Sequence, residues 1–389
     1  MRPTRAEIQL GAIAQNVATA KRLVGNAVQV MAVVKADAYG HGAVPVAKVA
    51  LDAGATWLGV ACPEEAVPLR DVGIRAPILV LSPTAPQQAE VVVRLGLDQC
   101  VSDPEQANPL AEEAAKARRE VRIHLKVDTG MGRVGVSPRE ARRAVERLAR
   151  FPPLKLVGLM THFADAEAED SSFSREQLRQ FGEVVEGLKA VGVSPAIRHA
   201  ANSAALLCLP ESRLDLVRPG IMLYGCHPRG RVAAGDPALA PALRLRTEVS
   251  QLKDLVKGSS MSYGRTFVAP ADIRVATLPI GYADGAGRLL SNRGEVLLRG
   301  KRVPIIGRVC MDMLMLDASR VPESRVGDEA VLIGRQGDEE ITADEFAGWQ
   351  GTISYEALCR IGPRVPRVYM GSGGACVEGA AWCFRSYLR

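Results

Sequence analysis

Between residues 28 and 225 the chain alternates short apolar runs with longer amphipathic stretches. There are eight apolar runs, at residues 28–35, 56–62, 77–82, 97–102, 121–128, 155–163, 196–200 and 214–225. Such alternation is typical of βα units that build a parallel sheet, and eight units favour a closed barrel over an open sheet. We therefore predict an α/β fold with an N-terminal (β/α)8 TIM-like barrel over residues 11–230.

The pattern changes after about residue 230. A loop containing Gly and Pro precedes β-type runs separated by turn residues, at 243–252, 273–280, 295–300, 304–316 and 329–334. We predict a mostly β C-terminal domain over residues 231–370. A strand from residues 1–10 is expected to join this domain, and residues 371–389 are expected to form an extension.

Composition and charge narrow the functional class. The 389 residues are 47% hydrophobic and 24% charged, which is typical of soluble globular proteins. The 49 basic and 43 acidic residues give a net charge of +6 without a long run of either sign, so nucleic-acid binding is not indicated. The densest basic stretch, residues 139–150, interleaves Arg with Glu and apolar residues, as the solvated face of an amphipathic helix does.

No segment reaches the roughly 18 uncharged apolar residues that cross a bilayer, and the first residues lack the apolar core of a signal peptide. We therefore expect a cytoplasmic protein without membrane contact. The cysteines include no CxxC pair, so neither a metal site nor a disulfide framework is expected in a reducing cytosol. They are Cys62, Cys100, Cys208, Cys226, Cys310, Cys359, Cys376 and Cys383.

Lys35 is the first residue that indicates chemistry, because it ends the first apolar run. Residues at the carboxyl ends of barrel strands converge on one mouth, and partial burial favours the neutral amine that reacts with a carbonyl cofactor. An isolated lysine there more often extends to solvent at the rim. Here Tyr39 and His41 follow closely, and Gly40 and Gly42 would allow a ligand phosphate to approach the backbone.

The segment AVVKADAYGHG at 32–42 closely resembles the pyridoxal-phosphate lysine motif of alanine racemases, which are fold-type III enzymes. The resemblance continues up to Tyr369 in many ordered segments, which makes chance agreement implausible. These segments are residues 127–135, 158–163, 198–205, 217–225, 261–267, 278–285, 307–313 and 355–369. The resemblance implies a cytoplasmic homodimer that interconverts L- and D-alanine with bound pyridoxal 5'-phosphate and supplies D-alanine for peptidoglycan.

The family resemblance implies two catalytic bases. Lys35 removes the α-proton of D-alanine, and Tyr263, reaching the site from the partner subunit, removes that of L-alanine. Racemisation needs one proton-transferring group on each face of the α-carbon. Because the reference pKa values of lysine and tyrosine are about 10.4 and 10, the pKa of each group must be lowered to act near neutrality.

The resemblance also assigns cofactor contacts. Arg218 faces the pyridine nitrogen, which therefore stays unprotonated because a guanidinium only donates, and His162 hydrogen-bonds Arg218. An unprotonated ring is a weaker electron sink, which disfavours side reactions. The phosphate contacts are Tyr39, Ser203, Tyr355 and the amides of Gly220 and Ile221. From its position after the seventh run, Ser203 is also compatible with an ordinary helix N-cap.

The remaining implied residues concern the substrate. Arg133 donates to the cofactor's phenolic oxygen and helps to place the substrate carboxylate, while Met311 of the partner subunit contacts the substrate. In many family members the lysine matching Lys126 is carbamylated and pairs with that arginine. The supporting residues are His199, Tyr282, Cys310 and Asp312.

Three alternative functions stay open at this point. A racemase of broader substrate range differs only in pocket size, and Tyr282, Tyr355 and Met311 favour a constricted entrance. A non-catalytic pyridoxal-phosphate-binding protein would share only the barrel, so the β domain weighs against it. A decarboxylase benefits from a protonated pyridine, which Arg218 opposes.

Overall fold

The computed structural model describes residues 2–371 and divides into two compact units. We call Ile13–Ala38 with Ala43–Leu239 the barrel unit, and Met1–Ala12, Tyr39–Gly42 and Ala240–Arg389 the β unit. Of the expected C-terminal extension, residues 372–389, with Cys376 and Cys383, lie outside the described residues.

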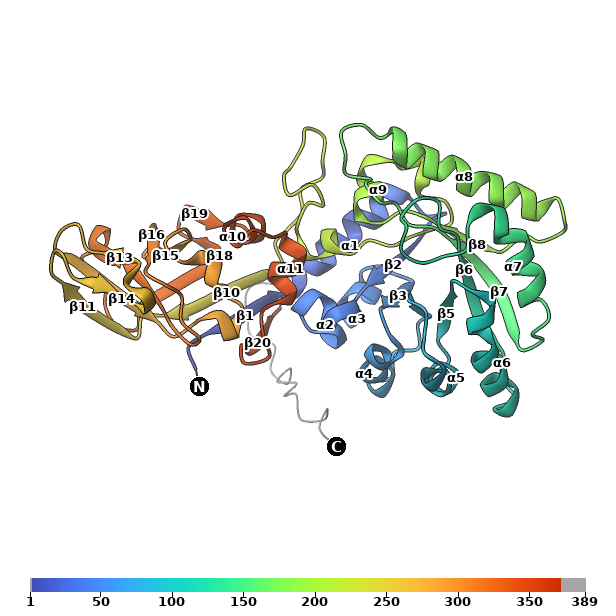
Figure 1. The fold of residues 1–389 in the computed structure, drawn as a ribbon, viewed down its shortest axis with the longest axis horizontal. Helices are drawn as coiled ribbons and strands as arrows, with labels where there is room; N and C mark the ends of the chain where they lie inside the picture. The colour runs from blue at the N-terminus through green and yellow to red at the C-terminus, as the bar shows by residue number, and fades with distance from the viewer. Residues whose placement is uncertain (1, 372–389) are drawn as a thin grey trace. The chain divides into compact units, whose positions relative to one another are not determined.

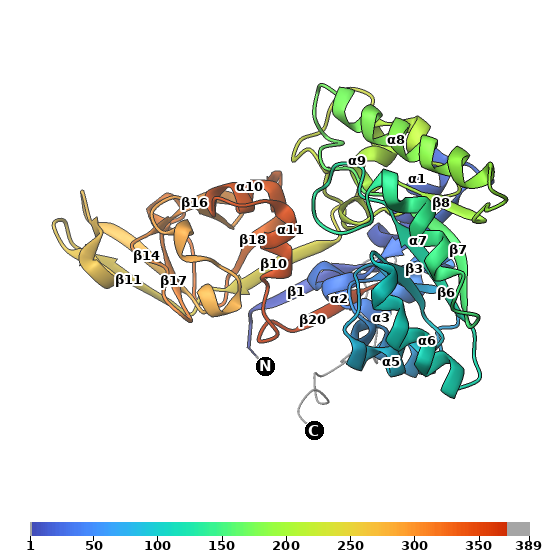
Figure 2. The same ribbon diagram turned by 45° about the vertical axis from the view of Figure 1, so that its right-hand side comes forward.

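The barrel unit contains eight parallel strands, one for each apolar run, in the spatial order β8-β7-β6-β5-β4-β3-β2-β9. Figure 1 shows helices α4–α8 on the outside of this sheet, and α5–α8 can be followed again in Figure 2. The strands are β2 (Gln29–Val33), β3 (Trp57–Val60), β4 (Ile78–Val80), β5 (Asp98–Val101), β6 (Val121–Lys126), β7 (Leu154–Met160), β8 (Ile197–His199) and β9 (Leu216–Val217). The predicted TIM-like barrel is confirmed.

The two end strands of this order, β8 and β9, are joined by hydrogen bonds at their flanks. The Asp215 amide donates to the Arg198 carbonyl at 3.1 Å, and the Arg218 amide donates to the Ala201 carbonyl at 2.9 Å. These bonds close the sheet into a barrel. The helices are α1 (Leu10–Val24), α2 (Lys35–Gly40), α3 (Ala43–Asp52), α4 (Val67–Asp71), α5 (Ala89–Leu95), α6 (Ala107–Lys116), α7 (Ala141–Leu148), α8 (Ser172–Lys189) and α9 (Ser203–Cys208).

A single buried cluster takes one residue from each of seven barrel strands. Only the interior of a closed barrel brings side chains from all these strands together. The members are Met31, Trp57, Leu79, Cys100, Met160, Ile197 and Leu216. The remaining strand, β6, contributes His124, whose ring meets Trp57 edge-on at a centroid distance of 5.7 Å.

The pairing of β6 with β7 contains a bulge next to His124. Ile123 pairs with Leu156 but His124 pairs with Gly158, so one residue of β7 has no counterpart. A β-carbon added to Gly158 would lie 2.0 Å from His124 Nδ1. Gly158 is therefore required for space, because the imidazole occupies the volume of the missing side chain.

This crowding gives a stability prediction for Gly158→Ala. The added methyl group must displace His124 inside a packed barrel, so we expect a loss of about 1–3 kcal/mol in the free energy of unfolding, measured by urea denaturation. Gly182→Ala on α8 is the control, since a β-carbon there meets no atom within 4 Å. It should gain roughly 0.5–1 kcal/mol from helix propensity. Equal stability of both variants would contradict the crowding.

The short helix α2, which begins at Lys35, is left-handed. Ala36, Asp37, Ala38 and Tyr39 have φ between +52° and +54°. This conformation costs L-residues roughly 1–2 kcal/mol each, so other contacts must hold it. In the barrel unit the amide of Ala36 donates to Glu65 at 2.7 Å, and Asp37 accepts from the amide of Ala43 at 2.7 Å.

The β unit is built mainly of strands, as predicted, and its main sheet has the order β11-β14-β17-β16-β15-β18-β10-β1-β20, with β19 on β18. Strand β1 pairs antiparallel with β10 and parallel with β20. Strands β12 and β13 form a separate hairpin, and the unit also contains helices α10 (Ala343–Trp349) and α11 (Ser354–Cys359). The strands are β1 (Arg5–Gln9), β10 (Leu243–Glu248), β11 (Gln251–Leu255), β12 (Ser260–Met261), β13 (Phe267–Val268), β14 (Ile273–Leu278), β15 (Glu295–Leu298), β16 (Lys301–Ile306), β17 (Leu314–Asp317), β18 (Glu329–Gln336), β19 (Glu339–Ile341) and β20 (Arg367–Met370).

Two of the apolar runs in the β unit are not single strands. Run 243–252 divides into β10, which pairs with β1 and β18, and β11, which pairs with β14. Run 304–316 divides into β16 and β17, and the intervening loop carries Cys310, Met311 and Asp312. Among the described helices, none combines the length and apolarity that a membrane crossing requires.

Candidate active site

Several candidate residues lie two positions after a residue of the barrel interior. His162 follows Met160, His199 follows Ile197, and Arg218 follows Leu216 by this spacing. Because side chains alternate between the two faces of a strand, the same inward face continues to the carboxyl end of each strand. Local strand geometry thus directs these groups toward the barrel mouth.

Arg218 is held from several sides in the barrel unit. Its side chain donates to His199 Nδ1 at 3.0 Å and His162 Nδ1 at 3.2 Å, and to the carbonyls of Thr161 and Ala200 at 2.7 and 2.8 Å. Burial lowers the pKa of Arg218 to about 10, so the group is still charged at neutral pH. The Arg218 guanidinium is therefore a cation that these hydrogen bonds hold in one orientation.

His162 marks a concentration of positive charge. Burial holds the pKa of His162 well below its usual range, and the charges of Arg218, Lys126, Arg133 and Lys35 lower it further, in that order. The imidazole is consequently neutral at pH 7, and four cationic side chains lie close enough to lower its pKa. Such a site suits a ligand with several negative or electron-rich oxygens.

Lys126 ends β6 with only 3% of its surface exposed. Burial lowers the pKa of Lys126 to about 8, with smaller contributions in the same direction from Arg218 and Arg133. An appreciable fraction of this amine is therefore neutral and nucleophilic near physiological pH.

The loop that carries Arg133 is organised by Asp128. The Asp128 carboxylate accepts hydrogen bonds from the amides of Gly130, Gly132 and Arg133 at 3.0–3.1 Å. Partial burial alone would raise the pKa of Asp128, but the amides of residues 130–133 lower it below its usual value. The ionised carboxylate thus fixes the backbone while the Arg133 side chain is left exposed.

The Ser203 hydroxyl contacts the backbone amides that follow β9. The Ser203 hydroxyl accepts from the amides of Gly220 and Met222 at 2.8 and 3.4 Å, and Ile221 begins a 3₁₀ turn. The N-cap role considered for Ser203 is wrong: Asn202 caps α9 by accepting from the Ala205 amide at 2.9 Å. The Ser203 hydroxyl therefore accepts from the backbone amides after β9 instead of capping α9.

The β unit places Tyr39 beside Tyr355, with ring centroids 6.1 Å apart. Burial raises the pKa of Tyr39. The glycines that follow Tyr39 have a different role from the phosphate approach proposed above. A β-carbon on Gly42 would lie 1.9 Å from Tyr369 Oη, and one on Gly40 would lie 2.7 Å from a backbone carbonyl, so both glycines serve packing inside this unit.

The other candidate side chains of the β unit include three that are largely exposed. Tyr263 is 71% exposed, Met311 52% and Tyr282 44%. The Tyr282 amide donates to the carbonyl of Cys310 at 3.0 Å, which ties the two segments together. Asp312 pairs with Arg364 at 2.7 Å.

Cys310 contacts the turn that carries Tyr263, since its sulfur lies 3.6 Å from the hydroxyl of Ser262. The candidates of the β unit thus form a surface of short loops, with exposed aromatic and methionine side chains.

Comparison with known proteins identifies the chain. Residues 8–228 match the family described as alanine racemase, N-terminal domain, and residues 242–369 match alanine racemase, C-terminal domain. The chain belongs to the alanine racemase family. The family resemblance found in the sequence is therefore confirmed, and the protein belongs to a family of isomerases.

Several alanine racemases are similar over nearly their full length. The protein of Symbiobacterium thermophilum is 50% identical over 374 residues, covering 95% of this chain and 98% of its own. That of Halothermothrix orenii is 46% identical, covering 96% and 98%. The crystal structure of alanine racemase from Bacillus anthracis with bound L-Ala-P superposes with a TM-score of 0.92, at 41% identity and 97% coverage of both chains.

Several buried polar residues of the barrel interior were not predicted from the sequence. Asp98 and Cys100 lie on β5 and His124 lies on β6, whereas Arg122 of β6, which pairs with Asp98, is exposed. The signal was present, because Lys126 follows His124 by two positions and alternation puts both on one strand face. Burial raises the pKa of Cys100 to about 11, although the charges of Lys126 and Arg218 lower it.

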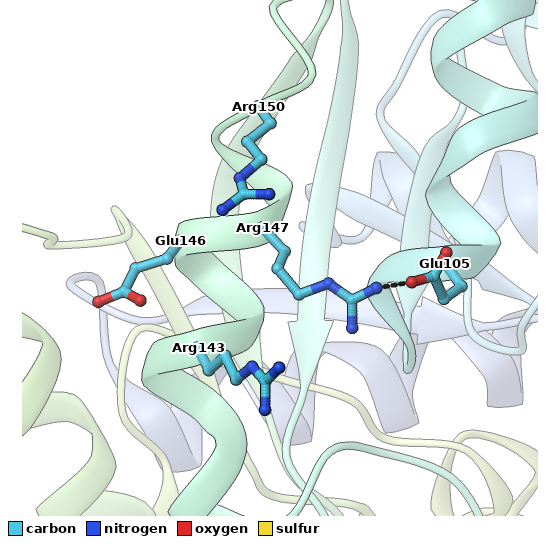
Figure 3. Close-up of a pocket in the computed structure, with 5 residues that line it drawn as sticks. All are labelled: Glu105, Arg143, Glu146, Arg147 and Arg150. Carbon is cyan, nitrogen blue, oxygen red and sulfur yellow. Dashed lines mark ion pairs between the residues drawn. The ribbon is translucent and has the colours of Figure 1, made fainter.

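A surface hollow lies elsewhere, beside α7, and Figure 3 shows its lining. It contains none of the candidate residues, and Arg147 forms an ion pair with Glu105 there. Residues 144, 145 and 148 of α7 are buried while Arg142, Arg143 and Glu146 are exposed. The amphipathic helix predicted for this basic stretch is confirmed.

Proposed function

We propose that the protein is a pyridoxal-phosphate-dependent racemase that interconverts L- and D-alanine by a two-base mechanism. The observation that carries the proposal is the group of cations, Lys35, Lys126, Arg133 and Arg218, around a neutral His162. It occurs in a chain whose relatives are named alanine racemases over almost their whole length. The cofactor supplies delocalisation that weakens the bond between the substrate's α-carbon and its proton.

The donors present fit each polar part of this cofactor. The Ser203 hydroxyl and the Ile221 amide are suitable donors to a phosphate. The Gly220 amide, which the family resemblance also assigns to the phosphate, donates to the Ser203 hydroxyl at 2.8 Å in this structure. Arg218 can only donate, so the pyridine nitrogen that it is proposed to face must accept and stay unprotonated. Arg133 is proposed for the phenolic oxygen, and the family resemblance adds the hydroxyls of Tyr39 and Tyr355 to the phosphate site.

Two residues of this chain are proposed to move the proton. Lys35 Nζ takes it from D-alanine and returns it on the same face, while Tyr263 Oη of the partner subunit does so on the opposite face. His162 and Arg218 belong to the barrel unit and stay fixed through the hydrogen bonds described above. Arg133 is proposed to help place the substrate carboxylate, and Met311 of the partner subunit is proposed to contact the substrate.

Exposure in the β unit supports a homodimer with shared sites. Tyr263, Tyr282 and Met311 present apolar surface on loops, and Met313 of the same segment is also half exposed. Aromatic and methionine side chains gathered at a surface favour protein association. We propose that a second copy covers them and that each site combines one barrel with the partner's loops.

The substrate can be tested by exchange of the α-proton in deuterated water. Purified protein with pyridoxal phosphate is offered L-alanine, L-serine, L-lysine and L-arginine separately, and optical rotation is followed. Rapid inversion of alanine alone supports the proposal. Inversion of the larger amino acids would indicate a broad-range racemase, and bound cofactor without any inversion would favour a non-catalytic binding protein.

Carbamylation of Lys126 gives a pH-dependent prediction. Carbon dioxide reacts with the neutral amine, and a pKa of about 8 makes about a tenth of Lys126 neutral at pH 7 and most of it neutral at pH 9. With ¹³C-bicarbonate we expect a carbamate resonance that grows over this range, because the neutral fraction of Lys126 grows. The carbamate is proposed to pair with Arg133. Lys126→Met should remove it, whereas Lys155→Met, at an exposed lysine of β7, should not. A resonance that persists without Lys126 would contradict the assignment.

D-alanine supply for peptidoglycan is the proposed cellular role. The cytoplasmic location stays a prediction from the sequence.

A further inference from the structure

Four buried polar residues form a continuous line through the barrel interior. Asp98 Oδ2 lies 3.3 Å from His124 Nε2, His124 Nδ1 lies 2.9 Å from His199 Nε2, and His199 Nδ1 lies 3.0 Å from Arg218. All four are less than 5% exposed. Asp98 begins β5 and Arg218 follows β9, so the line runs from the amino end to the carboxyl end of the barrel.

The direction of every hydrogen bond in this line is determined by Arg218. A guanidinium has only N–H groups, so His199 Nδ1 must accept. A neutral imidazole carries one proton, which in His199 is therefore on Nε2 and is donated to His124 Nδ1. His124 in turn carries its proton on Nε2 and donates it to Asp98, which accepts as a carboxylate.

The same argument excludes a second proton on either imidazole. A proton added to His124 Nδ1 would face the N–H of His199, and one added to His199 Nδ1 would face the N–H of Arg218. Burial, the largest cause in both cases, lowers the pKa of His124 and of His199. Geometry and charge thus agree that both rings are neutral.

Asp98 supplies the negative charge of the line. Within residues 2–371, no carboxylate forms an ion pair with Arg218, and the two rings connect its guanidinium to the Asp98 carboxylate. Asp98 also forms an ion pair with Arg122 at 3.2 Å, and the Arg122 guanidinium carbon lies 5.1 Å from the ring centroid of Trp57. Trp57 meets the His124 ring edge-on, which restricts its plane.

We infer that Asp98 and His124 are positioning residues, which lock His199 in its Nε2–H form and thereby orient the Arg218 guanidinium. The bulge in β7 and the absent side chain of Gly158 provide the space for the His124 ring. The consequence for catalysis rests on the proposed function, because Arg218 is proposed to face the cofactor. The hydrogen-bond line itself does not depend on it.

The direct test is the tautomeric state of the two imidazoles. The chain has only five histidines, so the ¹H–¹⁵N imidazole correlations of ¹⁵N-histidine-labelled full-length protein can be assigned by single substitutions. We expect neutral Nε2–H forms for His124 and His199 at neutral pH, with and without pyridoxal phosphate. A proton on Nδ1 of either ring, or a charged ring, would overturn the inference.

Two substitutions of His124 distinguish the loss of its hydrogen bonds from a change in side-chain packing. Gln offers an oxygen that accepts from His199 and an amide that donates to Asp98, whereas Leu offers neither. We expect His124→Leu to lower kcat on the order of tenfold with KM for alanine little changed, and His124→Gln to restore most of it. Equal losses in both variants would indicate packing alone.

The control is Asp215→Asn, which breaks a carboxylate–guanidinium pair with Arg198, the middle residue of β8, and removes no member of the line. It should leave the imidazole tautomers and kcat unchanged. If the tautomers are as expected but alanine is not racemised, the proposed function is contradicted and the inferred hydrogen-bond line is still supported. If alanine is racemised but a tautomer differs, the positioning role of Asp98 and His124 is contradicted and the proposed racemase function is supported.

Discussion

Lys35→Ala removes racemisation, with kcat expected to fall by at least about 10⁴-fold. Lys35 is the proposed attachment point of the cofactor carbonyl and the proposed base for D-alanine. The methyl side chain at position 35 of the variant can neither bind the carbonyl nor accept a proton. Because Lys35 is only partly buried and begins the left-handed α2, the loss should not come from unfolding. The measurement is inversion of alanine, together with the mass of the protein after borohydride reduction with added pyridoxal phosphate.

Lys155→Ala is the matched control for this experiment. Lys155 is an exposed lysine of β7 whose ammonium lies 3.2 Å from Glu120. Its loss should leave both activity and cofactor attachment intact. Attachment to Lys35→Ala protein at the wild-type level would show that another lysine binds the cofactor.

Tyr263→Phe should lower racemisation in both directions by about 10²–10⁴-fold, because each direction needs a base on one face and an acid on the other. The variant should fold normally, since Tyr263 is 71% exposed. In deuterated water we expect D-alanine to exchange its α-proton through Lys35 with retention of configuration, while L-alanine does not exchange. Normal inversion by this variant would exclude the two-base assignment.

The same two variants test whether sites are shared between subunits. When Lys35→Ala and Tyr263→Phe chains are mixed, about half of the dimers are hybrid, and each has one complete site if Tyr263 is supplied by the partner subunit. Activity should then return to about a quarter of the wild-type value. A site formed within one subunit would give no recovery on mixing.

Much of the barrel could be predicted because its signals are local. Alternation of strand and helix patterns gave the eight strands, and alternation within strands places His162, His199 and Arg218 on inward faces. The family motifs added the proposed functions of these residues. The limits of single strands in the β unit were less certain, since a continuous apolar run does not show where the chain turns from β10 to β11.

The residues that support the site were harder to find. His124 and Asp98 resemble ordinary polar residues of a strand, and their role depends on the pairing of β5, β6, β7 and β8. The requirement for Gly158 becomes visible only when the ring of His124 fills its side-chain volume. Similarly, Gly42 is explained by Tyr369, which lies more than 300 positions further along the chain.

The sequence by itself determined the two-part architecture, the family and the positions of the candidate catalytic residues, because periodicity and motifs are properties of neighbouring residues. The tertiary structure alone decided how Arg218 is held, why Gly40 and Gly42 lack side chains, and that residues 36–39 turn left-handed. These features depend on contacts between distant segments, whose distances and hydrogen-bond directions are fixed only when the strands are paired.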